Sequence, residues 1–167
     1  MTPIKLRPGG LSDLDAINDI ITRAIGTWTV SERVKRLSLP SYLYQPEDLD
    51  HLELLLAMDG HQPVAIAAWE PAESKHLPPG QTGLLLHGLY VDPDVARSGL
   101  GSALLNACQD AARERGFKGV LVKATRDAVG FFERCGFMRL PVMSQDRDYE
   151  LRYWLPCAEP LSPRPEP

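Results

Sequence analysis

Apolar residues recur at helical spacing in three parts of the chain. Residues 12–25 carry them on one face of a predicted helix. Residues 99–115 repeat the pattern, and Gly116 follows where such a helix would end. A shorter helix is predicted over residues 127–135, before Gly136. Each segment is expected to pack its apolar face against another element.

Continuous apolar runs between these segments predict strands. The predicted strands are 4–7, 52–58, 63–69, 83–91, 118–123 and 148–155, with Asp59-Gly60 as a hairpin turn between the second and third. This order predicts an α/β protein, in which a mixed sheet carries helices on its faces. The strand, helix, strand unit at residues 83–123 should place two parallel strands side by side.

The remaining segments are less regular. Ser12-x-x-Asp15 is a variant capping box that is expected to begin the first helix. Residues 26–50 have no clear period and predict one short helix with exposed aromatic side chains. The chain is therefore expected to form a single domain over residues 1–156, followed by a Pro-rich, disordered tail at residues 157–167.

Composition narrows the class of protein. The 167 residues are 44% hydrophobic and 24% charged, as in soluble globular proteins. A net charge of −4 argues against a protein that binds nucleic acid by neutralising phosphates. The three widely spaced cysteines form neither a disulfide framework nor a metal-binding pair, which favours a cytoplasmic setting. The sequence has no leader pattern and no apolar run near the roughly 20 residues of a membrane span, so no membrane association is expected.

The segment VDPDVARSGLGSALL joins the predicted strand 83–91 to the predicted helix 99–115. Gly99 and Gly101 in it either ease a tight turn or let a phosphate approach the free amides of the helix N-terminus. Their place between an apolar strand and a well-patterned helix favours phosphate binding. The Lys-Ser/Thr ending of a Walker loop and the third glycine of a dinucleotide fingerprint are both missing, so neither of those sites is expected.

This loop and the later segment AVGFFERCGF, residues 128–137, together resemble the GNAT superfamily of acetyl-CoA-dependent N-acetyltransferases. LYVDPDVARSGLGSALL is similar to the family's pyrophosphate loop, and the second segment is similar to its A-x-x-F-Y-x-x-x-G-F pattern. The resemblance implies a GNAT-like acyl-CoA N-acyltransferase fold, with acetyl-CoA held where two parallel strands of a splayed sheet separate. It also implies an enzyme that transfers acetyl from acetyl-CoA directly to a primary amine, without a metal.

The resemblance further implies which residues hold acetyl-CoA. The pantetheine arm would bind main chain near Leu89 and Val91, and the pyrophosphate would bind the amides of the glycine loop. The expected set is Leu89, Tyr90, Val91, Arg97, Ser98, Gly99, Leu100, Gly101, Ser102, Thr125, Arg126 and Phe132. Ala96 departs from the Gln or Arg that is usual in the family, and Arg97 is a substitute charge. Thr125 or Asp127 is also a candidate cap for the helix that follows.

Acetyl transfer to an amine needs a proton acceptor, because an alkylamine with a pKa near 10.4 is only about 0.04% neutral at pH 7. The candidates are His87, Glu70 and Glu53. His87 is preferred because imidazole titrates near neutral pH, and strand parity should place it on the same face as Leu89 and Val91. The resemblance adds that the arylalkylamine branch has a catalytic histidine at this place. The alternative is an ordinary half-buried histidine bonded to the backbone.

The departing CoA thiolate needs a proton or a hydrogen bond, which many family members supply from the tyrosine of the A-x-x-F-Y pattern. Phe132 stands at that position here. Tyr90, a tyrosine of the last predicted strand, or water is expected to take over this role. Cys135 lacks evident His or Asp partners for acyl-enzyme chemistry, and Cys108 lies on an apolar helix face, so direct transfer is favoured.

The sequence leaves the acceptor open between a small molecule and a peptide, and it leaves a homodimer open. The irregular segment 26–46 and the loop 70–82 are expected to recognise the acceptor. Trp28, Tyr42 and Tyr44 form either an aromatic wall or hydrophobic anchors for that segment.

Two rival functions also stay open. One is a CoA-binding or amine-sensing module without turnover, supported by Phe132 and Ala96. The other is a protein that binds a different nucleotide.

Overall fold

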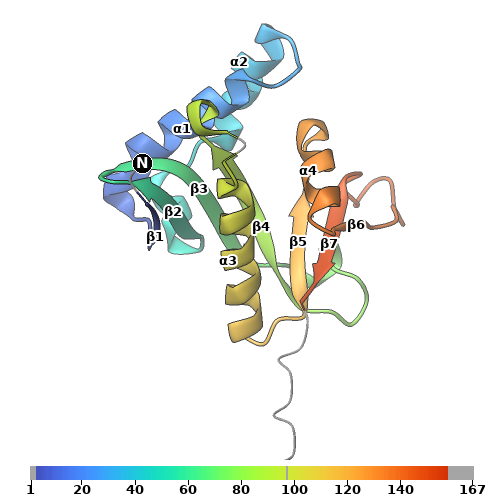
Figure 1. Ribbon diagram of the computed structural model, residues 1–167. Coiled ribbons are helices and arrows are strands. Elements are labelled where there is room, and N and C mark those ends of the chain that lie inside the picture. Colours follow the sequence, from blue (N-terminus) through green and yellow to red (C-terminus); the bar gives the residue numbers. More distant parts are fainter. Residues whose placement is uncertain (1–2, 97, 158–167) are drawn as a thin grey trace, which may run out of the picture.

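A mixed β-sheet forms the centre of the protein (Figure 1). The computed structural model describes residues 3–96 and 98–157, and within them seven strands follow the order β1-β2-β3-β4-β5-β7-β6. Their bounds are β1 (Ile4–Pro8), β2 (Glu53–Asp59), β3 (Gln62–Pro71), β4 (Gly83–Val91), β5 (Gly119–Lys123), β6 (Met138–Arg139) and β7 (Arg152–Pro156). The β4–β5 pair is parallel, and the other neighbouring pairs are antiparallel. The predicted mixed sheet and its parallel pair are confirmed.

Helices pack on both faces of this sheet, as predicted (Figure 1). Their bounds are α1 (Leu14–Gly26), α2 (Glu32–Tyr42), α3 (Leu100–Glu114) and α4 (Val129–Arg134), with 3-10 turns at Leu11–Asp13, Pro46–Asp50, Ser74–His76, Pro93–Val95 and Arg126–Ala128. Successive residues of a strand point to opposite faces. Ile66 and Ala68 of β3 therefore pack with α1, whereas Ala65 and Ala67 pack with α3 and α4. Among the described residues, no helix combines the length and apolar character that crossing a membrane requires.

An isoleucine-rich face holds α1 against the sheet. Its buried side chains are Leu14, Ile17, Ile20, Ile21 and Ile25, and full burial of such a side chain contributes about 1.5–3 kcal/mol. The predicted capping box is wrong, because the chain enters α1 through a 3-10 turn. The Asp13 carboxylate accepts a hydrogen bond from the Gly10 amide at 2.9 Å and pairs with Arg7 at 2.8 Å.

Residues 26–50 contain α2, which confirms the predicted helix there. The expectation of exposed aromatic side chains is wrong for Tyr44, which is only 3% exposed in the core beneath α1. The side chain of Asn18 bonds both the carbonyl oxygen and the amide of Tyr44, each at 2.9 Å. Tyr44 is thus a hydrophobic anchor, while Trp28 and Tyr42 are half-buried and meet edge to face, with ring centroids 5.2 Å apart.

The C-terminal part differs from prediction in its strands. The last strand, β7, begins at Arg152 rather than at 148, because the Asp148 carboxylate instead accepts hydrogen bonds from the amides of Met143 and Ser144. The two-residue strand β6 is too short to show any sequence period. Apart from Cys157, the predicted tail at residues 157–167 lies outside the described residues.

Two glycines close one end of the β4–β5 pair. Gly83 lies opposite Gly119, and the Trp154 ring covers both of them. The last paired residues are Leu86 and Val122. Beyond that point β5 ends, while β4 continues to Val91. The two parallel strands therefore diverge from a tightly packed end, as the resemblance to a splayed sheet implied.

A β-bulge interrupts β4 at the point of divergence. Gly88 pairs with Ala68 of β3, but Leu86 pairs with Trp69, so His87 is an extra residue without a partner in β3. A bulge of this kind changes which face the following side chains point to.

Candidate active site

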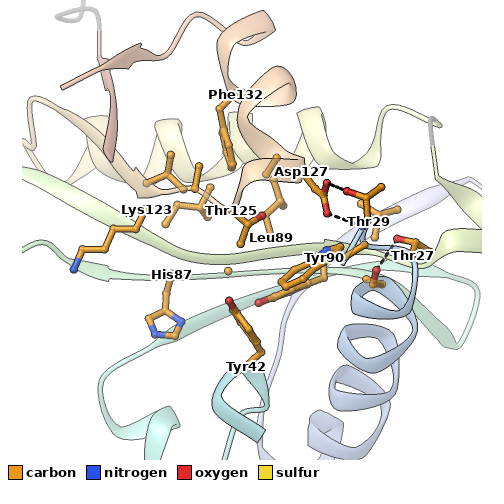
Figure 2. A pocket seen from close by; sticks show the side chains of 18 residues that line it. Thr27, Thr29, Tyr42, His87, Leu89, Tyr90, Lys123, Thr125, Asp127 and Phe132 are labelled. Carbon is orange, nitrogen blue, oxygen red and sulfur yellow. Dashed lines mark hydrogen bonds between the residues drawn. The ribbon is translucent and has the colours of Figure 1, made fainter. Parts of the chain in front are cut away.

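A cavity of about 420 Å³ opens where β4 and β5 separate (Figure 2). Its walls come from four segments that are far apart in the sequence, and the residues that line it are Ala24, Thr27, Trp28, Thr29, Tyr42, Leu86, His87, Gly88, Leu89, Tyr90, Val91, Val122, Lys123, Ala124, Thr125, Asp127, Ala128 and Phe132. Five residues of the expected site are among them: Leu89, Tyr90, Val91, Thr125 and Phe132. His87, the preferred base, also lines this cavity.

The bulge overturns one expectation about His87. Leu89 and Val91 pack against the core of α3, whereas His87 contacts Tyr44 in the core of α1. His87 therefore lies on the opposite face of β4 from Leu89 and Val91, and the parity argument is wrong. Figure 2 shows the result, with His87 and Tyr42 on one side of β4 and Phe132 on the other.

The His87 ring is oriented by Tyr44. The Tyr44 hydroxyl lies 3.1 Å from His87 Nδ1, and the ring centroids are 5.6 Å apart. Desolvation lowers the pKa of His87 below its ordinary value, an effect that Glu70 and Asp48 partly oppose, although the side chain keeps solvent access. Burial raises the pKa of Tyr44, so its hydroxyl keeps its proton. The imidazole is consequently neutral over most of the physiological pH range.

A second cavity, of about 400 Å³, shares a wall with the first. The residues that line both are Tyr42, Leu86, His87, Tyr90 and Lys123. Glu70 lines only the second cavity, with one carboxylate oxygen 3.8 Å from His51 Nε2. His87 thus lies in the wall that the two cavities share.

Hydrogen bonds connect the two sides of the first cavity at its rim. The Asp127 carboxylate accepts hydrogen bonds from the Thr29 hydroxyl at 2.7 Å and from the Thr29 amide at 3.1 Å (Figure 2). These bonds join the end of α1 to the turn before α4. The expected capping role of Thr125 or Asp127 is wrong, because no side chain caps the turn Arg126–Ala128 and the Asp127 carboxylate is used by Thr29.

The glycine loop begins α3 beside the same cavity. Gly99 is the N-cap residue with φ +83°, a left-handed conformation that favours glycine. The Gly99 carbonyl accepts a hydrogen bond from the Ala103 amide, and the amides of Leu100, Gly101 and Ser102 precede that first helical bond. A Cβ on Gly101 would lie 3.4 Å from Phe131 and 3.9 Å from Val91. The helix N-terminus is therefore next to the cavity wall that Val91 forms.

The wall of the first cavity does not include Ser98, Leu100 or Arg126 of the expected cofactor set. The Leu100 side chain is buried in the core, and the Ser98 hydroxyl donates to the Val95 carbonyl at 2.5 Å. Arg126 is exposed and does not line the cavity. Arg97 lies outside the described residues.

Most of the alternative acid–base candidates already form hydrogen bonds with other groups. Glu53 accepts hydrogen bonds from Trp69 Nε1 at 2.7 Å and from Arg115 at 3.2 Å, and it lines neither cavity. In the last predicted strand, the Tyr149 hydroxyl donates to the Ala124 carbonyl and the Tyr153 hydroxyl donates to Glu133. Tyr90 is the candidate from the sequence whose side chain lines both cavities, and burial raises its pKa.

The described residues include neither a cysteine with a lowered pKa nor a cluster of metal-binding side chains. Burial raises the pKa of Cys108 to about 12, and that of Cys135 is raised by burial as well. No group of three or more metal-binding side chains occurs among the described residues.

Two residues of the site escaped the sequence interpretation. The sequence predicts Tyr44 only as part of an aromatic wall or as a hydrophobic anchor, and Lys123 only as the end of a strand. A signal for Lys123 existed, since it is the one charged residue in the predicted strand core GVLVKA and the neighbouring parallel strand carries His87.

Sequence comparison assigns the family. The model of the acetyltransferase (GNAT) family matches residues 19–137, which include both cavities' central strands and the glycine loop. The chain belongs to this family. A comparison with curated proteins finds no match.

Solved structures share the fold. A GCN5-related N-acetyltransferase from Ralstonia eutropha superimposes with a TM-score of 0.71 at 21% identity, covering 86% of this chain and 97% of that one. The PaiA N-acetyltransferase from Thermoplasma acidophilum, solved with coenzyme A, gives 0.68 at 13% identity and covers 92% and 98%. A GNAT acetyltransferase from Brucella melitensis, solved with acetyl-CoA, gives 0.63 at 18% identity and covers 99% and 95%. These likenesses confirm the predicted GNAT fold.

Proposed function

We propose that the protein binds acetyl-CoA in the cavity between β4 and β5 and transfers its acetyl group directly to a primary amine. The observation that carries this proposal is the meeting of two cavities at His87, one beside the glycine loop and one lined by Glu70 and Glu73. The first would hold the thioester and the second the amine. Two relatives of the same fold were solved with coenzyme A or acetyl-CoA, which supports the choice of donor.

The chemistry needs one proton acceptor and one leaving-group partner. The amine nitrogen attacks the thioester carbonyl carbon, the C–N bond forms, and the C–S bond breaks to release CoA thiolate. His87 Nε2 takes the proton that the amine loses. The Tyr90 hydroxyl at the junction of the cavities donates a hydrogen bond to the thiolate, which water then protonates, since a thiol pKa near 8.5 makes this step undemanding.

The contact with Tyr44 can give His87 the tautomer that this role requires. A neutral imidazole carries its proton on one nitrogen only. If Nδ1–H donates to the Tyr44 hydroxyl oxygen, the Nε2 lone pair is free to accept a proton. Tyr44 is therefore a positioning residue rather than a catalytic one, because it touches only the back of the imidazole.

Replacing Tyr44 with phenylalanine is expected to lower kcat/KM about fivefold, the effect of losing one hydrogen bond of about 1 kcal/mol. The acid limb of the pH–rate profile should also move to lower pH. A bond donated by Nδ1–H stabilises the imidazolium, so its loss lowers the pKa of His87 further. Kinetics from pH 5 to 8 measure both effects. Movement of the limb to higher pH would mean that Tyr44 is the donor, and it would contradict the assigned tautomer.

The glycine loop offers a separate test of donor binding. A Cβ at Gly101 meets only ordinary contacts in the folded protein, with Phe131 as its nearest neighbour at 3.4 Å. Gly101→Ala should therefore leave the thermal stability of the free protein unchanged or slightly higher, since alanine favours helix. CoA affinity should fall about tenfold or more, because the methyl group occupies the space that a phosphate needs.

Thermal shift with and without CoA measures this result, since a ligand at 100 times its Kd stabilises by about 2.7 kcal/mol. Gly10→Ala is the matched control, because a Cβ there meets nothing within 4 Å and Gly10 lies outside both cavities. A Gly101→Ala variant that keeps the full CoA-induced shift would remove the loop from donor binding.

A panel of primary amines tests the function as a whole. Release of CoA from acetyl-CoA is followed with each amine, and formation of the acetylated amine is confirmed by mass spectrometry. Turnover with any amine supports the proposal. CoA binding without turnover on any amine would instead support a CoA-binding or amine-sensing module, a function favoured by the apolar Phe132 in the cavity wall.

A further inference from the structure

The second cavity has a cation in its wall, Lys123, that forms no ion pair with a described residue. Lys123 Nζ lies 3.3 Å from His76 Nε2, and within residues 3–96 and 98–157 Lys123 has no ion-pair partner. Burial lowers the pKa of Lys123, and the charges of Lys75 and Arg152 add to this effect while Glu73 opposes it. A partly desolvated ammonium of this kind is stabilised by an anion that enters the cavity.

Two carboxylates, Glu70 and Glu73, also line this cavity, but neither forms an ion pair with Lys123. Glu73 pairs with Lys75 at 3.2 Å. Glu70 lies on the His51 side of the cavity and raises the pKa of His87 by its charge. The neighbouring His76 supplies no anion, because an imidazole is either neutral or cationic, and burial lowers its pKa and so favours the neutral form. Its Nε2 accepts one of the three ammonium protons of Lys123, and the other two remain for a ligand.

Lys123 and His87 are neighbours across the split. Leu86 pairs with Val122, and His87 and Lys123 are the next residues of the two strands. Paired strands lie roughly 4.8 Å apart, and these two begin to diverge at this point. Both residues line the second cavity. A molecule whose amine faces His87 therefore has room for an anionic group close to that amine.

Resting on the proposed function, we propose that the acceptor is an amino acid or a similar small amino-carboxylate, whose carboxylate binds Lys123 Nζ while its amine faces His87. Glu70 supplies a negative charge near the incoming ammonium, and Lys123 supplies the positive charge near the carboxylate. The cavity wall thus matches a zwitterion in which the two charges are close together. A peptide N-terminus lacks a carboxylate at this spacing, so it is a poorer match.

Matched acceptors test this inference. Each set contains an amino acid, its carboxamide and the decarboxylated amine, with leucine, methionine and phenylalanine as the parent amino acids. The protein is expected to prefer the carboxylate member over the decarboxylated amine by about tenfold or more in kcat/KM, the usual effect of one charge-assisted hydrogen bond. Lys123→Met should reduce that preference about tenfold. Comparing the variant with the parent on the same set cancels the different reactivities of the three amines.

Two further variants separate charge from fold. Lys123→Arg keeps the positive charge and should retain most of the preference. Lys5→Met removes a lysine from the exposed strand β1 and should leave the preference unchanged. Thermal unfolding of each variant checks that it is folded.

The outcomes distinguish this inference from the function on which it rests. Turnover of amines without any preference for the carboxylate member, or a preference that survives in Lys123→Met, overturns the inference alone. A higher rate with the carboxamides would favour a peptide N-terminus and also overturn it. Peptide mass mapping after incubation with acetyl-CoA alone completes the test, because an acetyl group found on Lys123 would make this residue an acceptor and overturn the inference. Absence of turnover on every set, with turnover of another amine in the panel, overturns the inference alone, whereas absence of turnover on the whole panel overturns the proposed function as well.

Discussion

Replacement of His87 by alanine is expected to lower kcat/KM for amine acetylation by about 100-fold or more, the lower range for loss of a positioned general base. His87 lies at the junction of the two cavities, and its pKa is lowered mainly by desolvation. A base with a lowered pKa stays neutral at pH 7 and can accept the proton of the attacking amine. Steady-state kinetics on the best amine of the panel measure this loss.

The pH dependence of the same reaction checks the assignment. The lowered pKa means that His87 becomes protonated only below its ordinary value of about 6.5. The kcat/KM of the parent should therefore fall on the acid side along a limb centred below that value. The limb should be missing in His87→Ala, while the rise at high pH, which reports deprotonation of the amine, should remain.

His61→Ala is the matched control, because His61 is exposed in the turn between β2 and β3. It should keep the parental rate and the parental acid limb. A His87→Ala variant with unchanged kcat/KM and an unchanged limb would exclude His87 as the base and direct attention to Glu70, the other candidate that lines the acceptor cavity.

Gly119→Ala is expected to destabilise the protein by about 3 kcal/mol, at the upper end of overpacking effects. A Cβ at this position would collide with the Trp154 ring and lie 2.6 Å from the Leu155 carbonyl oxygen. The ring is only 6% exposed and the carbonyl belongs to the neighbouring strand, so neither can move cheaply. Chemical denaturation measures the loss as a lower midpoint at unchanged slope.

Gly101→Ala is the comparison for this stability effect, because it introduces the same methyl group where the nearest atom is 3.4 Å away. Its midpoint should not fall. If Gly119→Ala were as stable as the parent, the close packing of Trp154 on the Gly83–Gly119 pair would not be what holds the closed end of the split together.

The main elements of the fold could be predicted from the sequence because their signals are local. The apolar period of α1 and α3 and the hairpin of β2 and β3 each lie within about 20 consecutive residues. The glycine loop between β4 and α3 is also a local signal, and the family match confirms its interpretation as part of a GNAT domain. Short segments that depend on distant partners could not be predicted. Strand β6 is an example, because it is held only by its pairing with β7, which follows after residues 140–151.

The sequence by itself determined the order of the main strands and helices, the family, and His87 as the first candidate for the base. Only the tertiary structure decided which way His87 faces, because the bulge in β4 depends on the register with β3. It also brought Tyr44, 43 positions away in the chain, into contact with His87, and it placed Lys123, 36 positions away, in the same cavity wall. Periodicity describes a single strand or helix, whereas a site at a split in a sheet is made by the pairing and divergence of several strands.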